Sequence, residues 1–249
     1  MLALFNQGMV LGEDGEKMSK SRGNGVAPDN LVEKYGADTV RAYLMFFARW
    51  EQGGPWNYDG IKGPQRLLQD VWLFGLSAYQ PTAVSESATK ALRRKTHQTI
   101  RKVTQDIESF AFNTAVAAIM ELRNALQDAA KQRNVTTEAW NEAITNLLLV
   151  LAPIAPHITE ELWERRGGQY SIHQQAWPTW DEEVAKEEAI TVVVQANGKV
   201  RNRFEMAAEA SEDEIKAAAL SSEKVQPWFE GKEPRKVIVV KGQLVNIVV

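Results

Sequence analysis

The apolar residues between Ala88 and about Gly168 recur at the period of an α-helix, and this pattern constrains the fold of the 249-residue chain more than any other. The pattern breaks near 110–113, a helix can begin with Thr137 as its N-cap, and Pro156 suits the first turn of another. The inward positions include Leu92, Ile100, Val103, Ile107, Val116, Ile119, Leu126, Ile144, Leu147, Leu151, Leu162 and Trp163. Four helices with short connections predict a helical bundle.

Beyond residue 188 the chain changes to the features of strands and hairpins. Asn197-Gly198 is the signal of a type I′ hairpin turn, and Ser211 begins a capping box for a short helix with Ile215 inward. The predicted strands are 190–195, 199–206, 237–240 and 244–249. A small module of strands and one helix is therefore expected after the bundle.

The second of these strands carries cations at alternate positions. Alternate residues of a strand share one face, and here three of them are the cations Lys199, Arg201 and Arg203. Arg235 and Lys236 stand where the next strand begins. The cationic face either contacts RNA or is the polar outer face of a half-buried strand, and the sequence favours neither interpretation.

The first helix of the bundle also has a basic face, formed by Arg93, Arg94, Lys95, His97, Arg101 and Lys102. Contacts to nucleic-acid phosphates require only positive charge and no base specificity. A solvated helix surface has the same composition, so the two interpretations have equal weight.

Residues 25–80 combine helical patterns with glycine and proline breaks and several aromatic residues. Aromatic side chains are used mainly for burial. We therefore expect Trp50, Trp56, Trp72 and Phe74 to lie in a core rather than to stack on bases. The stretch from Gln80 to Ser87 is typical of a linker.

A compact basic loop lies near the N-terminus, with the sequence Lys17-Met18-Ser19-Lys20-Ser21. A short strand at 9–11 and a turn at 12–15 precede it, and a helix is expected from Pro28 to Tyr35, with Gly36 at its C′ position. Two ammonium groups three residues apart suit a loop that closes over a polyphosphate. A lysine-rich turn without this context is usually only a solvated loop.

The pentapeptide 17–21 is the KMSKS signature of class I aminoacyl-tRNA synthetases, and the run from Glu33 to Arg41 resembles the segment that follows it in the leucyl, isoleucyl, valyl and methionyl enzymes. The segment 153–163 resembles their appended helical domain. The hairpin around Asn197-Gly198 and the run that begins at Arg235 resemble the C-terminal domain of bacterial leucyl-tRNA synthetases. The resemblance covers nearly the whole chain.

This resemblance implies a mostly α fold with a small α/β C-terminal domain. The implied parts are the end of a Rossmann-type catalytic domain with the KMSKS loop at 1–24, a connecting fold at 25–80, an anticodon-binding-like bundle at 88–178 and a ββαββ-like, tRNA-contacting domain at 188–249. In the leucyl branch the bundle is not expected to read the anticodon.

The resemblance also implies a function. The complete enzyme would activate leucine with ATP and transfer it to tRNA(Leu). Lys20 would contact the ATP phosphates with help from Lys17, and Met18, Ser19 and Ser21 would complete the ATP-binding loop. The tRNA would be bound by Lys199, Arg201, Arg203, Arg235, Lys236, Arg93 and Arg94. Mg2+ would arrive with ATP, because no metal site is expected in this chain.

The family's HIGH tetrapeptide is absent from the sequence. We therefore expect the chain to be inactive alone and to need an N-terminal half that carries HIGH and the editing domain. Two alternatives stay open: a tRNA-binding or assembly module without catalysis, and a related synthetase for another aliphatic amino acid.

The composition excludes several other classes of protein. The formal net charge of −3 provides no global attraction to nucleic acid, so RNA contacts would be local. The absence of cysteine excludes a disulfide framework, and His97, His157 and His173 are too far apart in sequence to suggest a metal site. No signal peptide or membrane span is apparent, so the cytoplasm is the expected location.

Overall fold

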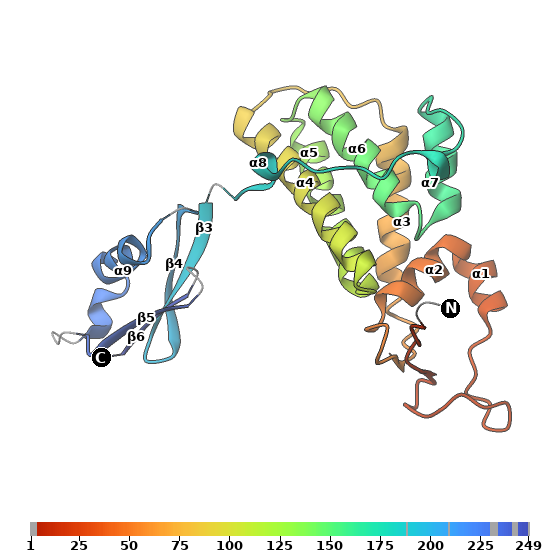
Figure 1. The fold of residues 1–249 in the computed structure, drawn as a ribbon, viewed down its shortest axis with the longest axis horizontal. Coiled ribbons are helices and arrows are strands. Elements are labelled where there is room, and N and C mark those ends of the chain that lie inside the picture. Colours follow the sequence, from red (N-terminus) through yellow and green to blue (C-terminus); the bar gives the residue numbers. More distant parts are fainter. Residues whose placement is uncertain (1–3, 188, 209, 230–233, 241–243, 249) are drawn as a thin grey trace. The chain divides into compact units, whose positions relative to one another are not determined.

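The computed structural model describes residues 4–187, 189–208, 210–229, 234–240 and 244–248. They form two compact units, residues 1–185 and 186–249, and each is described by itself. The first unit is helical apart from one two-stranded pairing (Figure 1). Its elements are β1 (Val10–Leu11), α1 (Pro28–Tyr35), α2 (Ala37–Phe46), β2 (Gly54–Pro55), α3 (Lys62–Leu76), α4 (Glu86–Glu108), α5 (Phe112–Gln132), α6 (Thr137–Leu151), α7 (Pro156–Arg165), η1 (Ile172–Gln174) and α8 (Glu182–Ala185).

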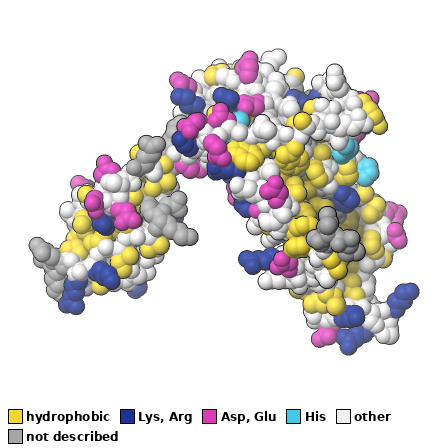
Figure 2. Space-filling model, in the orientation of Figure 1, with side chains coloured by type: hydrophobic (Ala, Val, Ile, Leu, Met, Phe, Trp, Pro, Cys, Tyr) yellow, Lys and Arg dark blue, Asp and Glu magenta, His cyan; other side chains and the backbone are white. Residues whose placement is uncertain are grey.

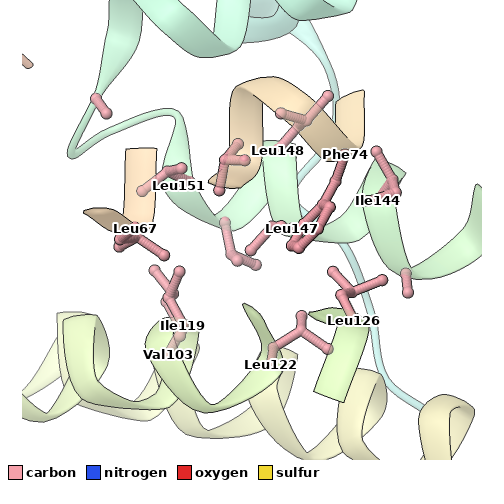
Figure 3. Packing of buried hydrophobic residues seen from close by; sticks show 14 of the residues in the cluster. Leu67, Phe74, Val103, Ile119, Leu122, Leu126, Ile144, Leu147, Leu148 and Leu151 are labelled. Atoms are coloured by element: carbon pink, nitrogen blue, oxygen red, sulfur yellow. The ribbon is translucent and has the colours of Figure 1, made fainter. Parts of the chain in front are cut away.

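The four predicted helices of the bundle are confirmed as α4 to α7. Their apolar faces meet in one core, and α3 adds its own apolar face to it. Figure 3 shows this packing for Leu67, Phe74, Val103, Ile119, Leu122, Leu126, Ile144, Leu147, Leu148 and Leu151. Of the four aromatic residues predicted to lie in a core, Trp56 and Phe74 are buried, and Trp72 packs half-buried against the bundle core. Trp50 is half-buried and belongs to none of the core clusters of the described residues.

Local signals set the ends of these helices. Ser85 caps α4 by accepting a hydrogen bond from the backbone N–H of Ala88, so the helix begins earlier than the predicted linker allowed. The N-cap of α6 is Thr136 and not Thr137, because Thr136 has the extended backbone and its hydroxyl accepts from the N–H of Ala139. Two adjacent threonines made the sequence ambiguous by one residue.

In its described residues the second unit is a four-stranded sheet with strand order β4-β3-β6-β5, one α-helix and one short 3-10 helix. β3 runs antiparallel to β4 and parallel to β6, and β6 runs antiparallel to β5. Its core consists of Val192, Val194, Ile215, Ala219, Val225, Val245 and Ile247. The elements are β3 (Ala189–Ala196), β4 (Lys199–Ala207), α9 (Glu212–Ser221), η2 (Gln226–Phe229), β5 (Lys236–Val240) and β6 (Leu244–Val248).

Two local predictions for this unit are confirmed. Asn197 and Gly198 both have positive φ, as a type I′ turn requires, and the capping box of Ser211 and Glu214 is formed in both directions. The fold class is likewise confirmed: the chain is mostly α-helical with a small α/β module. Among the described residues, no helix combines the length and the apolar character that a membrane crossing needs.

The prediction that Lys199, Arg201 and Arg203 share one face is wrong. A bulge interrupts the pairing of β3 with β4: Val194 lies opposite Asn202, Gln195 lies opposite Val200, and Arg201 has no residue opposite. The extra residue reverses the alternation, which leaves Val200 exposed. The cations on the two sides of the bulge therefore point to opposite faces of the sheet.

Candidate nucleotide loop and nucleic-acid interface

The KMSKS loop is built on a small strand pairing, as the sequence predicts for residues 9–11. β1 pairs in parallel with β2, Leu11 opposite Pro55, and Leu11 also forms an antiparallel bridge with Lys17. The N–H of Gly12 donates to the carbonyl of Glu16 over 2.8 Å, which closes the turn before the signature. The chain therefore enters and leaves this turn as two adjacent extended segments, with the basic residues directly after them.

A hydrogen-bond network fixes the loop, and its two central residues, Asp14 and Asn24, were not predicted as site residues. The side-chain oxygen of Asn24 accepts from the N–H of Ser19 over 2.8 Å, and its amide donates to the Asp14 carboxylate over 3.0 Å. Asp14 also accepts from the N–H of Glu16 over 3.0 Å. These hydrogen bonds from Glu16 and Asn24 lower the pKa of Asp14, so the network favours its carboxylate form. The sequence marks this arrangement only by Gly23-Asn24, a pair typical of turns, shortly after the signature.

Met18 anchors the loop to an apolar cluster beneath it. This cluster consists of the buried residues Leu31, Val40, Tyr43, Trp56 and Ile61, and Met18 packs against it half-buried. Tyr43 and Trp56 meet edge to face with ring centroids 4.9 Å apart. One residue of the signature thus packs on a core, while Lys17 and Lys20 are exposed.

Lys17 and Lys20 are exposed, and no acidic partner for either ammonium group appears among the described residues. The hydroxyls of Ser19 and Ser21 are 2.7 Å apart, and Arg22 pairs with Glu16 at 3.3 Å. Figure 2 shows Lys and Arg side chains at the tip of this segment, which Figure 1 draws at lower right. Two ammonium groups without acidic partners, on a loop fixed by hydrogen bonds, can attract a polyanion such as a phosphate chain.

The basic face of α4 is different, because most of its cations have acidic partners. Arg93 pairs with Glu142 at 2.8 Å, His97 contacts the same carboxylate at 3.0 Å, and Arg101 pairs with Glu182 at 2.8 Å. Lys95 and Lys102 pair with Glu121 and Asp106. Glu142 raises the pKa of Arg93 through its hydrogen bond and charge. Figure 2 shows acidic and basic side chains intermixed near α8 and α4.

The C-terminal cations lie on several surfaces of the second unit. Arg203 is exposed on the sheet face that α9 leaves open, opposite Val193. Arg201 instead lies 3.3 Å from the centroid of the Trp228 ring, a close cation–π contact, and its Nε is buried without a hydrogen-bond partner. Lys199, Arg235 and Lys236 are exposed.

The histidines have structural neighbours. The Nδ1 atom of His157, in the first turn of α7, is 2.7 Å from the carboxylate of Asp38, and the N–H of Asp181 donates to the Nδ1 atom of His97 over 2.9 Å. Nowhere in the described part of the chain do three or more His, Cys, Asp or Glu side chains gather as metal ligands would.

With this geometry in place, comparison with known families decides where the chain belongs. Residues 89–216, more than half of the chain, match the family model described as the anticodon-binding domain of tRNA ligase. The chain belongs to this family. Residues 2–52, which include the KMSKS loop, match the model for class I tRNA synthetases of the I, L, M and V types. The anticodon-binding match runs from the bundle into the second unit.

Individual relatives that the chain resembles are aminoacyl-tRNA ligases. The chain is 52% identical over 246 residues to a leucine–tRNA ligase of Dehalococcoides mccartyi and 50% identical over 250 residues to that of Herpetosiphon aurantiacus. It spans only about 30% of the length of each. The crystal structure of an Agrobacterium radiobacter LeuRS in a ternary complex with tRNA and LeuAMS matches 99% of the chain and 32% of that protein, with 29% identity and a TM-score of 0.76. A methionyl-tRNA synthetase of Mycobacterium tuberculosis shares the fold over 66% of the chain, with 21% identity and a TM-score of 0.52.

Proposed function

We propose that these 249 residues are the part of a leucine–tRNA ligase that supplies the ATP-binding KMSKS loop and surfaces for tRNA(Leu). The observation that carries this proposal is the loop itself: Lys17 and Lys20 are exposed on a loop that the hydrogen-bond network of Asp14 and Asn24 fixes. Identity of about 50% to leucine–tRNA ligases along the chain supports leucine over another aliphatic amino acid.

The proposed chemistry begins with activation of leucine. The leucine carboxylate attacks the α-phosphorus of ATP, leucyl-adenylate forms, and pyrophosphate leaves with the electrons of the broken P–O bond. Negative charge grows on the departing pyrophosphate, and the ammonium groups of Lys20 and Lys17 stabilise it most in the transition state. Ser19 and Ser21 shape the loop, and Mg2+ accompanies the substrate phosphates.

The second step transfers the leucyl group to the terminal ribose of the tRNA, with AMP as the leaving group. We assign tRNA contacts to Arg203, Lys199, Arg235 and Lys236 in the second unit. Arg201 is a weaker candidate, because its guanidinium packs on the Trp228 ring. Arg94 and Arg93 on α4 are weaker candidates, because ion pairs reduce the positive charge of this face. Contacts of these cations to the phosphate backbone of the tRNA require no recognition of individual bases.

The parts of the chain have separate proposed roles. Residues 1–24 end the catalytic domain, 25–80 form the connecting fold, 88–178 form the anticodon-binding-like bundle, and 188–249 form the tRNA-contacting domain. The proposed location is the cytoplasm, where a chain without cysteine meets no redox constraint.

The decisive experiment is leucine-dependent ATP–pyrophosphate exchange by this chain, alone and mixed with an N-terminal half of a leucine–tRNA ligase that carries HIGH and the editing domain. Exchange only in the mixture is the expected result. A mixture that exchanges with another aliphatic amino acid and not with leucine would contradict the assignment. Absence of exchange in both samples, with tRNA binding retained, would favour the binding module without catalysis.

A further inference from the structure

Helix α2 has two faces, and each belongs to a different core. Val40 and Tyr43 lie in the apolar cluster against which Met18 of the KMSKS loop packs. Ala42, which is fully buried, lies instead in the core of the helical bundle. The same helix therefore supports the loop on one side and contacts the bundle on the other.

Asp38, in the first turn of α2, completes a different helix. α7 begins at Pro156, and its N-cap residue Ala155 has no side chain that could accept a hydrogen bond. The Asp38 carboxylate takes this role: it accepts from the N–H of Ile158 over 2.7 Å and lies 2.7 Å from the Nδ1 atom of His157. Asp38 is only 9% exposed, so the contact is largely shielded from water.

Arg41, one turn further along α2, holds the chain just before α7. Its Nε donates to the carbonyl of Ile154 over 3.1 Å and its Nη2 donates to the carbonyl of Pro153 over 2.9 Å. A carboxylate thus accepts from one backbone N–H in the first turn of α7, and a guanidinium donates to two carbonyls of the α6–α7 turn. Each charge matches the partial charge of the backbone groups that it contacts.

A second set of contacts joins the loop-bearing segment to the α4–α5 turn. Phe5 stacks on Phe110 with ring centroids 4.2 Å apart, and Trp50 meets Phe112 edge to face at 5.2 Å. Figure 1 shows the α4–α5 and α6–α7 turns at the end of the bundle where α2 lies. Residues before and after the loop are therefore attached to the same end of the bundle.

We propose that Asp38 and Arg41 are positioning residues for the KMSKS loop. They fix α2 to the α6–α7 turn, and α2 carries the cluster that anchors Met18, so the bundle sets where Lys17 and Lys20 stand. This inference rests on the proposed role of the loop in leucine activation. Neither residue touches the reacting atoms, and both act by fixing the position of the KMSKS loop.

The test is the rate of pyrophosphate exchange by the complete leucine–tRNA ligase that contains these residues, with a matched pair of variants. Arg41→Met keeps the aliphatic stem and removes both donors. Arg166→Met is the control, because the Arg166 guanidinium donates over 3.0 Å to the carbonyl of Gly75 in α3 and over 3.0 Å to Asn141 in α6, and neither partner belongs to the cluster beneath the loop. We expect kcat to fall between about 10- and 100-fold for Arg41→Met and less than about 2-fold for Arg166→Met.

Both variants should lower the thermal midpoint of unfolding, so stability alone does not separate them. Equal losses of kcat in the two variants would overturn the proposal. Combining Arg41→Met with Lys20→Ala gives a second criterion: the further loss caused by Arg41→Met should shrink when Lys20 is already absent. A full additional loss would show that Arg41 acts elsewhere.

Amide hydrogen exchange of residues 12–24 in the 249-residue chain tests the inference without catalysis and with milder changes. Asp38→Asn and Arg41→Lys should raise the exchange rate there, and Arg166→Met should not. Unchanged rates in the first two variants would overturn the positioning role. If the unmodified complete ligase shows no leucine-dependent exchange activity, the proposed function fails, and the hydrogen-exchange result still decides whether Asp38 and Arg41 order the loop.

Discussion

Two basic segments of this chain look alike in sequence and differ in structure. The KMSKS loop presents Lys17 and Lys20 to solvent with no acidic partner among the described residues. The α4 face has more cations, yet Glu142, Glu121, Glu182 and Asp106 compensate most of them. The number of cations in a segment therefore does not measure the charge that it offers to a ligand. Partners from elsewhere in the chain determine that charge.

The largest expected effect tests the loop side of this comparison. Lys20→Ala in the completed enzyme should slow leucine-dependent pyrophosphate exchange about 100- to 1,000-fold, because a charge aimed at the leaving group is lost. Binding of tRNA should change far less. Lys131→Ala, at an exposed lysine near the end of α5, is the control and should leave both unchanged. Equal losses in exchange and in tRNA affinity would contradict the role of Lys20.

The next effect concerns the hydrogen-bond network that fixes the loop. Asn24→Ala removes the acceptor for the Ser19 N–H and the donor to Asp14, so the lysines lose their fixed place. We expect kcat for pyrophosphate exchange to fall about tenfold. Glu13→Ala changes an exposed acidic residue of the same turn and serves as the control. An unchanged kcat for Asn24→Ala would mean that leucine activation does not need the hydrogen-bond network.

A smaller effect tests the compensated side. Glu142→Gln should reduce the free energy of unfolding by about 1 kcal/mol at pH 7, because Arg93 and His97 lose a charged partner. It should also steepen the salt dependence of RNA binding, since an arginine becomes available to phosphate. Glu164→Gln, at an exposed residue of α7, is the control. An unchanged salt slope would exclude α4 as a masked RNA surface.

The pH dependence of the same variant has a defined sign. Burial raises the pKa of Glu142, but hydrogen bonds and charges from Arg93 and His97 outweigh it and leave the pKa below the ordinary value. The stabilisation is therefore present above the unfolded pKa of about 4.3 and disappears as the pH falls through the lower folded value. Urea unfolding should show a difference between wild type and Glu142→Gln at pH 7 that shrinks below about pH 4.

The smallest effect separates the two arginines beside the bulge in β4. Arg203→Ala should lower the slope of log affinity against log salt by about one, as expected for one lost phosphate contact. Arg201→Ala should act mainly on stability, by about 1 kcal/mol, because it removes the contact with Trp228. The reverse result, with the slope changed only by Arg201→Ala, would show that the bulge does not decide which arginine meets RNA.

Much of the fold could be predicted because its signals are local. The helical period gave α4 to α7, Asn197-Gly198 gave the hairpin turn, and Ser211 gave the start of α9. The KMSKS pentapeptide located the candidate loop. Each of these features depends on residues within a few positions of one another.

The errors and omissions share a physical cause, which is dependence on distant residues. The bulge at Arg201 is defined only by the register of β4 against β3. The pair of Arg93 and Glu142 joins residues 49 positions apart, and no period in the sequence reveals it. The Asp14 contact with Asn24 spans 10 residues and passes around the loop that the signature marks. Side-chain partners of this kind are fixed by tertiary packing.

Because Asp38 caps α7, the support of the KMSKS loop can form only late in synthesis of the chain. Asp38 and Arg41 meet partners that lie 112 to 120 residues later in the sequence. A chain emerging from a ribosome therefore cannot complete the support of its KMSKS loop until the α6–α7 turn has been synthesised and has left the exit tunnel. A nascent chain that stops before residue 153 has the signature lysines but none of the partners of Asp38 and Arg41.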